Sequence, residues 1–178
     1  MTTYVVLLRG VNLGPNRRIA MADLRGWLAE LSAGPVRTHL QSGNALLDSD
    51  LPAGELVPAV VKRLAEETGV AVRCLVRTHE ELQGVLDRNP FAGIATDPAR
   101  LVVAFLSARP ARPRLATLDP QEYLPERWHI DDREIYLWHP DGIHKSKLTN
   151  ELTDRNLGVM ATARNWNTVT KLAELSAP

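Results

Sequence analysis

The chain has 178 residues with a hydrophobic fraction of 44%, which suits one compact domain or two small, tightly packed subdomains with a real core. Its formal net charge is zero, so no overall field draws the protein to nucleic acid or to a membrane. Cysteine occurs once, at Cys74, which excludes an internal disulfide and a cysteine-based metal cage.

The N-terminal segment has no basic region and reaches Arg9 after a short apolar run. That run is too short to span a bilayer, and without a basic region it lacks the form of a signal peptide. We therefore expect a soluble, cytoplasmic protein with no membrane partner.

In the first half of the chain, the sequence pattern predicts strands and helices in the order β-α-β-β-α-β. Short runs rich in β-branched residues predict strands at residues 4–9, 36–41, 45–48 and 72–77, with Ser42-Gly43-Asn44 as a hairpin turn. Apolar residues at helical spacing predict a helix at residues 21–31 and another from Leu56 to Gly69. This order is the split βαβ arrangement of a ferredoxin-like sandwich.

The second half predicts a related series of elements. A capping box at Thr78 and Glu81 opens a short helix that ends before Asn89. The further expected elements are a central strand at 101–106, a connector at 107–120 with one helical turn, a hairpin at 128–138, a helix at 147–156, and a last helix that Thr162 caps. We infer a degenerate duplication: an α+β fold of two ferredoxin-like subdomains, residues 1–90 and 91–178, packed as one unit.

The loop after the first strand is rich in glycine, asparagine and arginine. Backbone N–H groups in such a loop can bind an anion near the start of the next helix. We count Arg9, Gly10, Asn12 and Asn16 as candidate ligand-binding residues. An equally good interpretation is that glycine and asparagine only supply positive φ angles.

The hairpin residues Ser42 and Asn44 are also candidates, although a turn explains them better than a nucleophilic Ser42 does. Lys145 and Lys147 lie at the start of an expected helix and form either an anion subsite or a solvated basic turn.

The segment from Thr162 to Thr168 is unusually polar for the start of a helix. Its candidate residues are Arg164, Asn165, Asn167 and Thr168, and on a helix Arg164, Thr168 and Lys171 would share one face. The alternative is structural: Arg164 ties the two halves together, or the carboxamides satisfy a buried loop. We favour a polar site, and we expect this segment to face the Arg9 loop across the seam between the halves.

The five histidines show no zinc-binding spacing, so we expect neither a metal nor a cofactor.

Several of these segments together resemble the family known as domain of unknown function 1697. The matching residues are Leu8-Arg9-Gly10-Val11-Asn12, Gly14, Asn16, Met21, Gln41-Ser42-Gly43-Asn44, Gly142, Ser146-Lys147-Leu148 and Thr162 to Val169. Pro15 departs from the glycine that family members usually carry at that position. The resemblance implies an α+β fold of two ferredoxin-like halves, and it implies no established activity.

Two hypotheses of function follow. The first is a binding protein for an anionic ligand, either a phosphorylated small molecule or nucleic acid, in a cleft between the halves. The alternative is a hydrolase or transferase that acts on a small polar or phosphorylated substrate, although the sequence contains no recognisable nucleophile–base pair. The sequence leaves the oligomeric state open.

Overall fold

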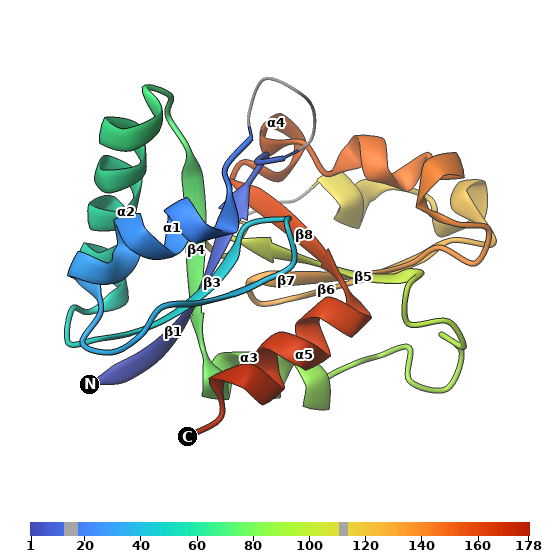
Figure 1. The fold of residues 1–178 in the computed structure, drawn as a ribbon. Coiled ribbons are helices and arrows are strands. Elements are labelled where there is room, and N and C mark those ends of the chain that lie inside the picture. Colours follow the sequence, from blue (N-terminus) through green and yellow to red (C-terminus); the bar gives the residue numbers. More distant parts are fainter. Residues whose placement is uncertain (13–17, 111–113) are drawn as a thin grey trace. The chain divides into compact units, whose positions relative to one another are not determined.

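The computed structural model describes residues 1–12, 18–110 and 114–178, and within these residues the chain is a mixed α+β protein. Figure 1 shows its strands and helices. The strands are β1 (Thr2–Arg9), β2 (Arg37–His39), β3 (Asn44–Ser49), β4 (Arg73–Thr78), β5 (Leu101–Leu106), β6 (Arg127–Asp131), β7 (Glu134–Trp138) and β8 (Ala161–Asn165). The α-helices are α1 (Met21–Leu28), α2 (Ala53–Thr68), α3 (His79–Asp87), α4 (Asp154–Leu157) and α5 (Trp166–Ser176). Short 3-10 helices lie at Ala29–Leu31, Arg114–Thr117, Pro120–Tyr123, Ile143–Lys145 and Leu148–Glu151.

The described chain divides into two compact units. The first consists of Met1–Gln83 with Leu172–Pro178, and the second is Gly84–Lys171. The C-terminal segment joins the first unit through the end of α5, where Nδ1 of His79 lies 3.1 Å from the carbonyl oxygen of Ala173. The subdomain bounds expected from the sequence, 1–90 and 91–178, stay a prediction.

The sheet of the first unit has the strand order β2-β3-β1-β4, with every pair antiparallel. The register places Val5 opposite Leu46 on one side and opposite Arg77 on the other. Since side chains alternate along a strand, Tyr4, Val6 and Leu8 point to the same face, where they join the core beneath α1 and α2.

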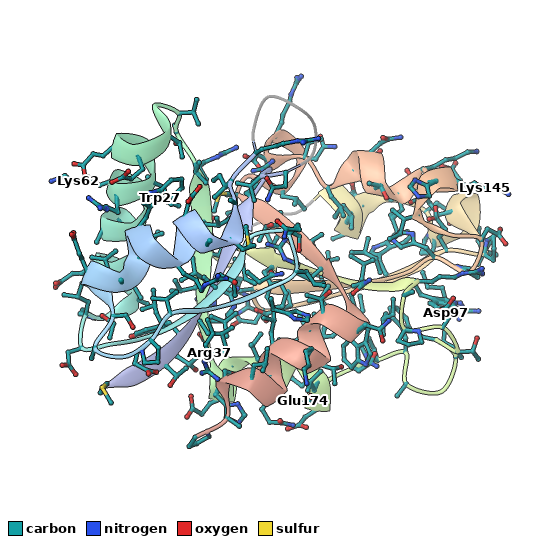
Figure 2. All side chains as sticks on the ribbon, in the orientation of Figure 1. Trp27, Arg37, Lys62, Asp97, Lys145 and Glu174 are labelled. Carbon is teal, nitrogen blue, oxygen red and sulfur yellow. The ribbon has the colours of Figure 1, made fainter. Side chains whose placement is uncertain are left out.

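The two helices of the first unit follow the predicted apolar stripes. On α1, Leu24 and Leu28 are fully buried, and the carbonyl of Trp27 accepts a hydrogen bond of 3.2 Å from Nε of Arg63 on α2. Figure 2 shows Trp27 beside α2. Helix α2 ends at Gly69, whose φ of 68° provides the left-handed cap that the sequence predicts.

The capping box at the start of α3 forms as predicted. The backbone N–H of Thr78 donates to Glu81 Oε2 at 2.9 Å, and the N–H of Glu81 donates to Thr78 Oγ1 at 3.2 Å. Both residues thereby satisfy backbone donors that the first turn of a helix leaves unpaired.

The sheet of the second unit has the order β6-β7-β5-β8, again antiparallel throughout. Every residue of β5 is buried, as expected for a central strand. One face of this sheet packs on a core that includes Val102, Ala104, Ile135 and Leu137. The predicted hairpin joins β6 to β7 through Asp132, whose φ is 46°.

The single helix predicted at 147–156 is wrong. A 3-10 helix at Leu148–Glu151 and the short α4 at Asp154–Leu157 take its place. Thr153 starts α4 by accepting a hydrogen bond from the backbone N–H of Asn156, and this competes with helix continuation. The break allows both Leu148 and Leu157 to reach the core of the second unit.

The start predicted for the last helix is also wrong. Thr162 to Asn165 belong to β8, where Ala163 lies opposite Ala104 and Asn165 opposite Val102 on β5. The helix begins only at Trp166. Pairing with the buried central strand β5 provides hydrogen-bond partners for the backbone of this segment. The local polar pattern therefore did not predict its conformation correctly.

Gly43 lies where the β2–β3 turn crosses the end of β1. Its carbonyl accepts a hydrogen bond of 2.8 Å from the N–H of Leu8, and its φ is 77°. A Cβ atom at this position would lie 2.5 Å from Cγ2 of Val11 and 2.8 Å from Cβ of Leu8. Glycine is therefore required both by the backbone conformation and by the close approach.

We expect Gly43→Ala to lower the free energy of unfolding by about 2–4 kcal/mol, because left-handed strain and overpacking add. Urea denaturation measures this loss. Gly69→Ala is the matched control: it has a similar φ of 68° and nothing within 4 Å of the added Cβ, so it should lose only the strain contribution. Equal losses in the two variants would contradict the packing argument.

Candidate functional site

The carboxamide of Asn12 holds the loop after β1 in place through hydrogen bonds to backbone groups of Ile19 and Gln41. Asn12 has a φ of 56°. Its Nδ2 donates to the carbonyl of Ile19 at 3.0 Å and to that of Gln41 at 2.5 Å, while its Oδ1 accepts from the N–H of Ile19 at 2.8 Å. One side chain thus joins the two ends of the loop and ties them to the β2–β3 turn. Asn16 lies outside the described residues.

Asn44 and Ser42 build the hairpin turn. Asn44 is fully buried, and its Nδ2 donates to the carbonyl of His39 at 2.8 Å and to Oγ of Ser42 at 3.0 Å. The turn residues Gln41 to Asn44 and the segment Leu8 to Asn12 therefore meet in the first unit, through hydrogen bonds made by Asn12 and Gly43.

A small cavity of about 100 Å³ lies at the end of β1. Two arginines line it: Arg9, which is half-buried, and Arg18, which is exposed. The other lining residues are Gly10, Val11, Ile19, Thr68, Val70, Ala71 and Val72. Gly10 contributes a φ of 69° where the chain leaves the strand. Two arginines that line one small cavity are suited to an oxyanion.

Arg164 lies on β8 and not on a helix, so the predicted helical face with Thr168 and Lys171 is wrong. The side chain is only 8% exposed, and Nη1 donates to Thr162 Oγ1 at 2.9 Å and to the carbonyl of Ala163 at 2.8 Å. Burial lowers the pKa of Arg164 to about 10, so the guanidinium stays charged at neutral pH. The expectation that this segment faces the Arg9 loop stays a prediction.

Asn165 and Thr168 form the N-terminal cap of α5. Oδ1 of Asn165 accepts hydrogen bonds from the backbone N–H of Thr168 at 3.0 Å and from its hydroxyl at 2.8 Å. Asn167 is exposed on the first turn. The polarity that marked this segment in the sequence is thus partly explained by the ordinary chemistry of a helix start.

Lys145 and Lys147 line a cavity of about 150 Å³ in the second unit. Figure 2 shows Lys145 extending outward from its segment. The same cavity is lined by Glu122, Tyr123, Leu124, Pro125, Glu126, Asp141 and Gly142. The lysines therefore share their cavity with three acidic residues, and the choice between an anion subsite and a solvated basic turn stays a prediction.

Glu126 is the residue of this cavity that sequence reasoning missed. Its carboxylate accepts hydrogen bonds from Nδ1 of His139 at 2.6 Å and from the N–H of Leu148 at 3.4 Å, and Ser146 contributes a third. Burial raises the pKa of Glu126, but these donors outweigh burial and hold the pKa below its ordinary value of 4.5. Nothing in the sequence marks Glu126, because its partners come from distant segments.

Three further observations concern metal ions, the single thiol and membranes. Among the described residues, no group of three or more His, Cys, Asp or Glu side chains is placed to hold a metal ion. Burial raises the pKa of Cys74 to about 12, so this thiol is protonated and unreactive at neutral pH. No helix within the described ranges is both long and apolar enough to span a bilayer.

The family model described as "Protein of unknown function (DUF1697)" matches residues 1–136. The chain belongs to this family. The DUF1697 match includes the Asn12 loop and the Gly43 hairpin, whereas the motif residues from Gly142 to Val169 lie beyond the matched range. A comparison with curated proteins found no match.

The DUF1697 chain is also similar to a solved structure, that of the conserved bacterial protein SP0830 from Streptococcus pneumoniae. The two are 23% identical with a TM-score of 0.76, and the similarity covers 99% of this chain and 98% of the other. At this identity the similarity shows the fold alone.

We expect Asn165→Ala to lower the free energy of unfolding by about 0.5–2 kcal/mol, because α5 loses its capping acceptor. Chemical denaturation measures the loss, and Asn167→Ala is the matched control. Since Asn167 is exposed, its replacement should change stability by less than about 0.5 kcal/mol. The capping interpretation fails if the two variants are equally stable.

We expect Glu126→Gln to destabilise the protein by about 1–3 kcal/mol at neutral pH. The pKa of Glu126 is lower in the folded state than the ordinary 4.5, so its stabilisation is full above that value and is lost as pH falls through the folded pKa. The difference between wild type and variant should therefore shrink as pH falls from about 5 to about 3. Thermal unfolding across this range tests it, with the exposed Glu122→Gln as control. A difference that does not vary with pH would contradict the assignment.

Proposed function

We propose that this protein binds a small anionic ligand, such as a phosphorylated metabolite, in the cavity at the end of β1. The observation that carries the proposal is the pair of arginines, Arg9 and Arg18, that line one cavity of about 100 Å³ beside Gly10. Guanidinium groups pair with phosphate and carboxylate oxygens through two parallel hydrogen bonds, which gives such a cavity both affinity and orientation.

The net charge of the protein and the volume of the cavity favour a small ligand over nucleic acid. A nucleic acid binds through many phosphate contacts, and its affinity depends on an extended basic surface. The formal net charge is zero, and the cavity volume of about 100 Å³ suits one anionic group. Lys145 and Lys147 are less suited to the same task, because three carboxylates line their cavity.

The alternative is a hydrolase or transferase acting on a small polar or phosphorylated substrate. Its best support is Glu126, a carboxylate with a lowered pKa at a cavity wall. However, Ser146 and His139 both hydrogen-bond to Glu126, so the hydroxyl and the imidazole share an acceptor and do not form a nucleophile–base pair. Binding is therefore the better-supported function.

We also infer that each half is ferredoxin-like and that the two arose by duplication. The element order β1-α1-β2-β3-α2-β4 and the strand order β2-β3-β1-β4 support this assignment for the first half. The order β6-β7-β5-β8 repeats it strand for strand in the second half.

The register supports the duplication residue by residue. Val5 lies opposite Arg77, and Val103 lies opposite Arg164. Both arginines are buried, and each donates through Nη1 to the carbonyl of the residue before it, at 3.0 and 2.8 Å. In each half the next residue, Thr78 or Asn165, then caps a helix.

Binding of defined anions tests the proposed function. We expect inorganic phosphate, pyrophosphate or a ribonucleoside monophosphate to bind in isothermal titration calorimetry, more weakly as salt rises. Arg18→Ala should weaken binding about 10- to 100-fold, because it removes a charge-assisted hydrogen bond. Arg37→Ala is the matched control, since it removes the same charge from an exposed position on β2.

The same samples separate the alternatives. Binding confined to a short RNA would replace the small-ligand proposal with a nucleic-acid one. Turnover of a phosphorylated probe that Glu126→Gln abolishes would favour the enzyme. The proposal is wrong if none of the anions binds, or if Arg18→Ala and Arg37→Ala behave alike.

A further inference from the structure

Two cavities of the second unit adjoin one another. The charged cavity of about 150 Å³ and a larger groove of about 470 Å³ share Leu124 and Glu126 as lining residues. A ring contact also links them: Tyr123 lines the charged cavity and meets Trp128 of the groove edge-to-face, with ring centroids 5.4 Å apart. A molecule bound in one cavity can therefore extend into the other.

The groove is mainly apolar. Its walls include Phe91, Leu115, Leu118 and Trp128, with Gln121 and Arg127 among the polar residues that line it. Its volume of about 470 Å³ is within the range of small-molecule sites, about 300–1000 Å³. Leu124, at the junction, is 52% exposed, and an apolar ligand that covered it would remove that surface from water.

The smaller cavity carries both signs of charge. Glu122, Glu126 and Asp141 line it together with Lys145 and Lys147. A simple anion would meet the three carboxylates, and a simple cation would meet the two ammonium groups. A zwitterion can pair with both kinds of side chain at once, so it is the charge type that this cavity fits.

We propose that the second unit binds a free amino acid with a large apolar side chain. Its ammonium group pairs with the carboxylates of the smaller cavity, its carboxylate pairs with Lys147, and its side chain lies in the groove beside Trp128. This site is separate from the Arg9–Arg18 cavity, and the proposal does not depend on the anion-binding function.

A set of four probes tests each part of the ligand by isothermal titration calorimetry on the full chain. The probes are L-phenylalanine, N-acetyl-L-phenylalanine without the ammonium group, L-phenylalaninamide without the carboxylate, and glycine without the apolar side chain. L-Phenylalanine should bind, and each of the other three should bind at least about tenfold more weakly.

Two variants with matched controls locate the site. Lys147→Gln should weaken L-phenylalanine binding at least about tenfold, whereas Lys62→Gln on the exposed face of α2 should leave it unchanged. Leu124→Ser should weaken binding severalfold. Leu40→Ser, at an exposed leucine of the first unit, should have no effect. All four positions are exposed, so circular dichroism should show unchanged folds.

Three results would overturn the proposal. The first is no heat of binding for L-phenylalanine at millimolar concentration. The second is binding of the acetylated and amidated probes with the same affinity as L-phenylalanine, which would mean that only the apolar groove acts. The third is equal affinity in Lys147→Gln and Lys62→Gln.

Discussion

The antiparallel pairing of one central strand with two neighbours is the constraint on which each unit depends. In the first unit β1 pairs with β3 and β4, and in the second β5 pairs with β7 and β8. Because side chains alternate along a strand, a slip of one residue would exchange the two faces of the sheet. The register thus decides that Arg77 lies opposite Val5 and that Arg164 lies opposite Val103. In each unit the arginine lies on the face of the sheet opposite to the hydrophobic core cluster described above. A buried arginine is tolerated only where hydrogen bonds are in place, and the carbonyl of the preceding strand residue supplies one in both cases.

Much of the fold followed from the sequence where periodicity and turn chemistry agree. Short-range sequence patterns predicted the strands of both hairpins, the apolar stripe of α2 and the capping box of α3, because each of these features depends on residues close together in the chain. The segment Thr162 to Asn165 was misread as helix because its conformation is fixed by pairing with β5, some 60 residues earlier in the chain. The helix expected at 147–156 failed for a related reason: burial of both Leu148 and Leu157 decided where the chain bends.

The candidate site divides according to side-chain chemistry. Each of the asparagines Asn12, Asn44 and Asn165 uses its carboxamide on nearby groups of its own chain, closing a loop, building a turn or starting a helix. A carboxamide has the same donors and acceptor as a peptide group, which is why it serves so well where the backbone leaves regular structure. The cations are placed differently: Arg9, Arg18, Lys145 and Lys147 line cavities. The sequence alone could not separate the asparagines that stabilise local structure from the cations that line cavities, since each role places polar residues at or near the ends of strands and helices. Glu126 could not be found at all, because its partners His139 and Leu148 meet it only in the fold.

If the two halves arose by duplication, they differ most in what connects equivalent strands. In the first half α1 and α2, of 8 and 16 residues, join β1 to β2 and β3 to β4. In the second half the same connections are made by 3-10 helices of three or four residues and by the four-residue α4. Short helices cover less of a sheet than an amphipathic α-helix does, so they leave hollows beside the core. The two adjoining cavities described above are lined by residues of these short elements, including Tyr123 and Lys145 in one and Leu115 in the other. The two sheets share strand order and register while their connectors differ, so a binding site built on the connectors leaves the core of the sheet unchanged.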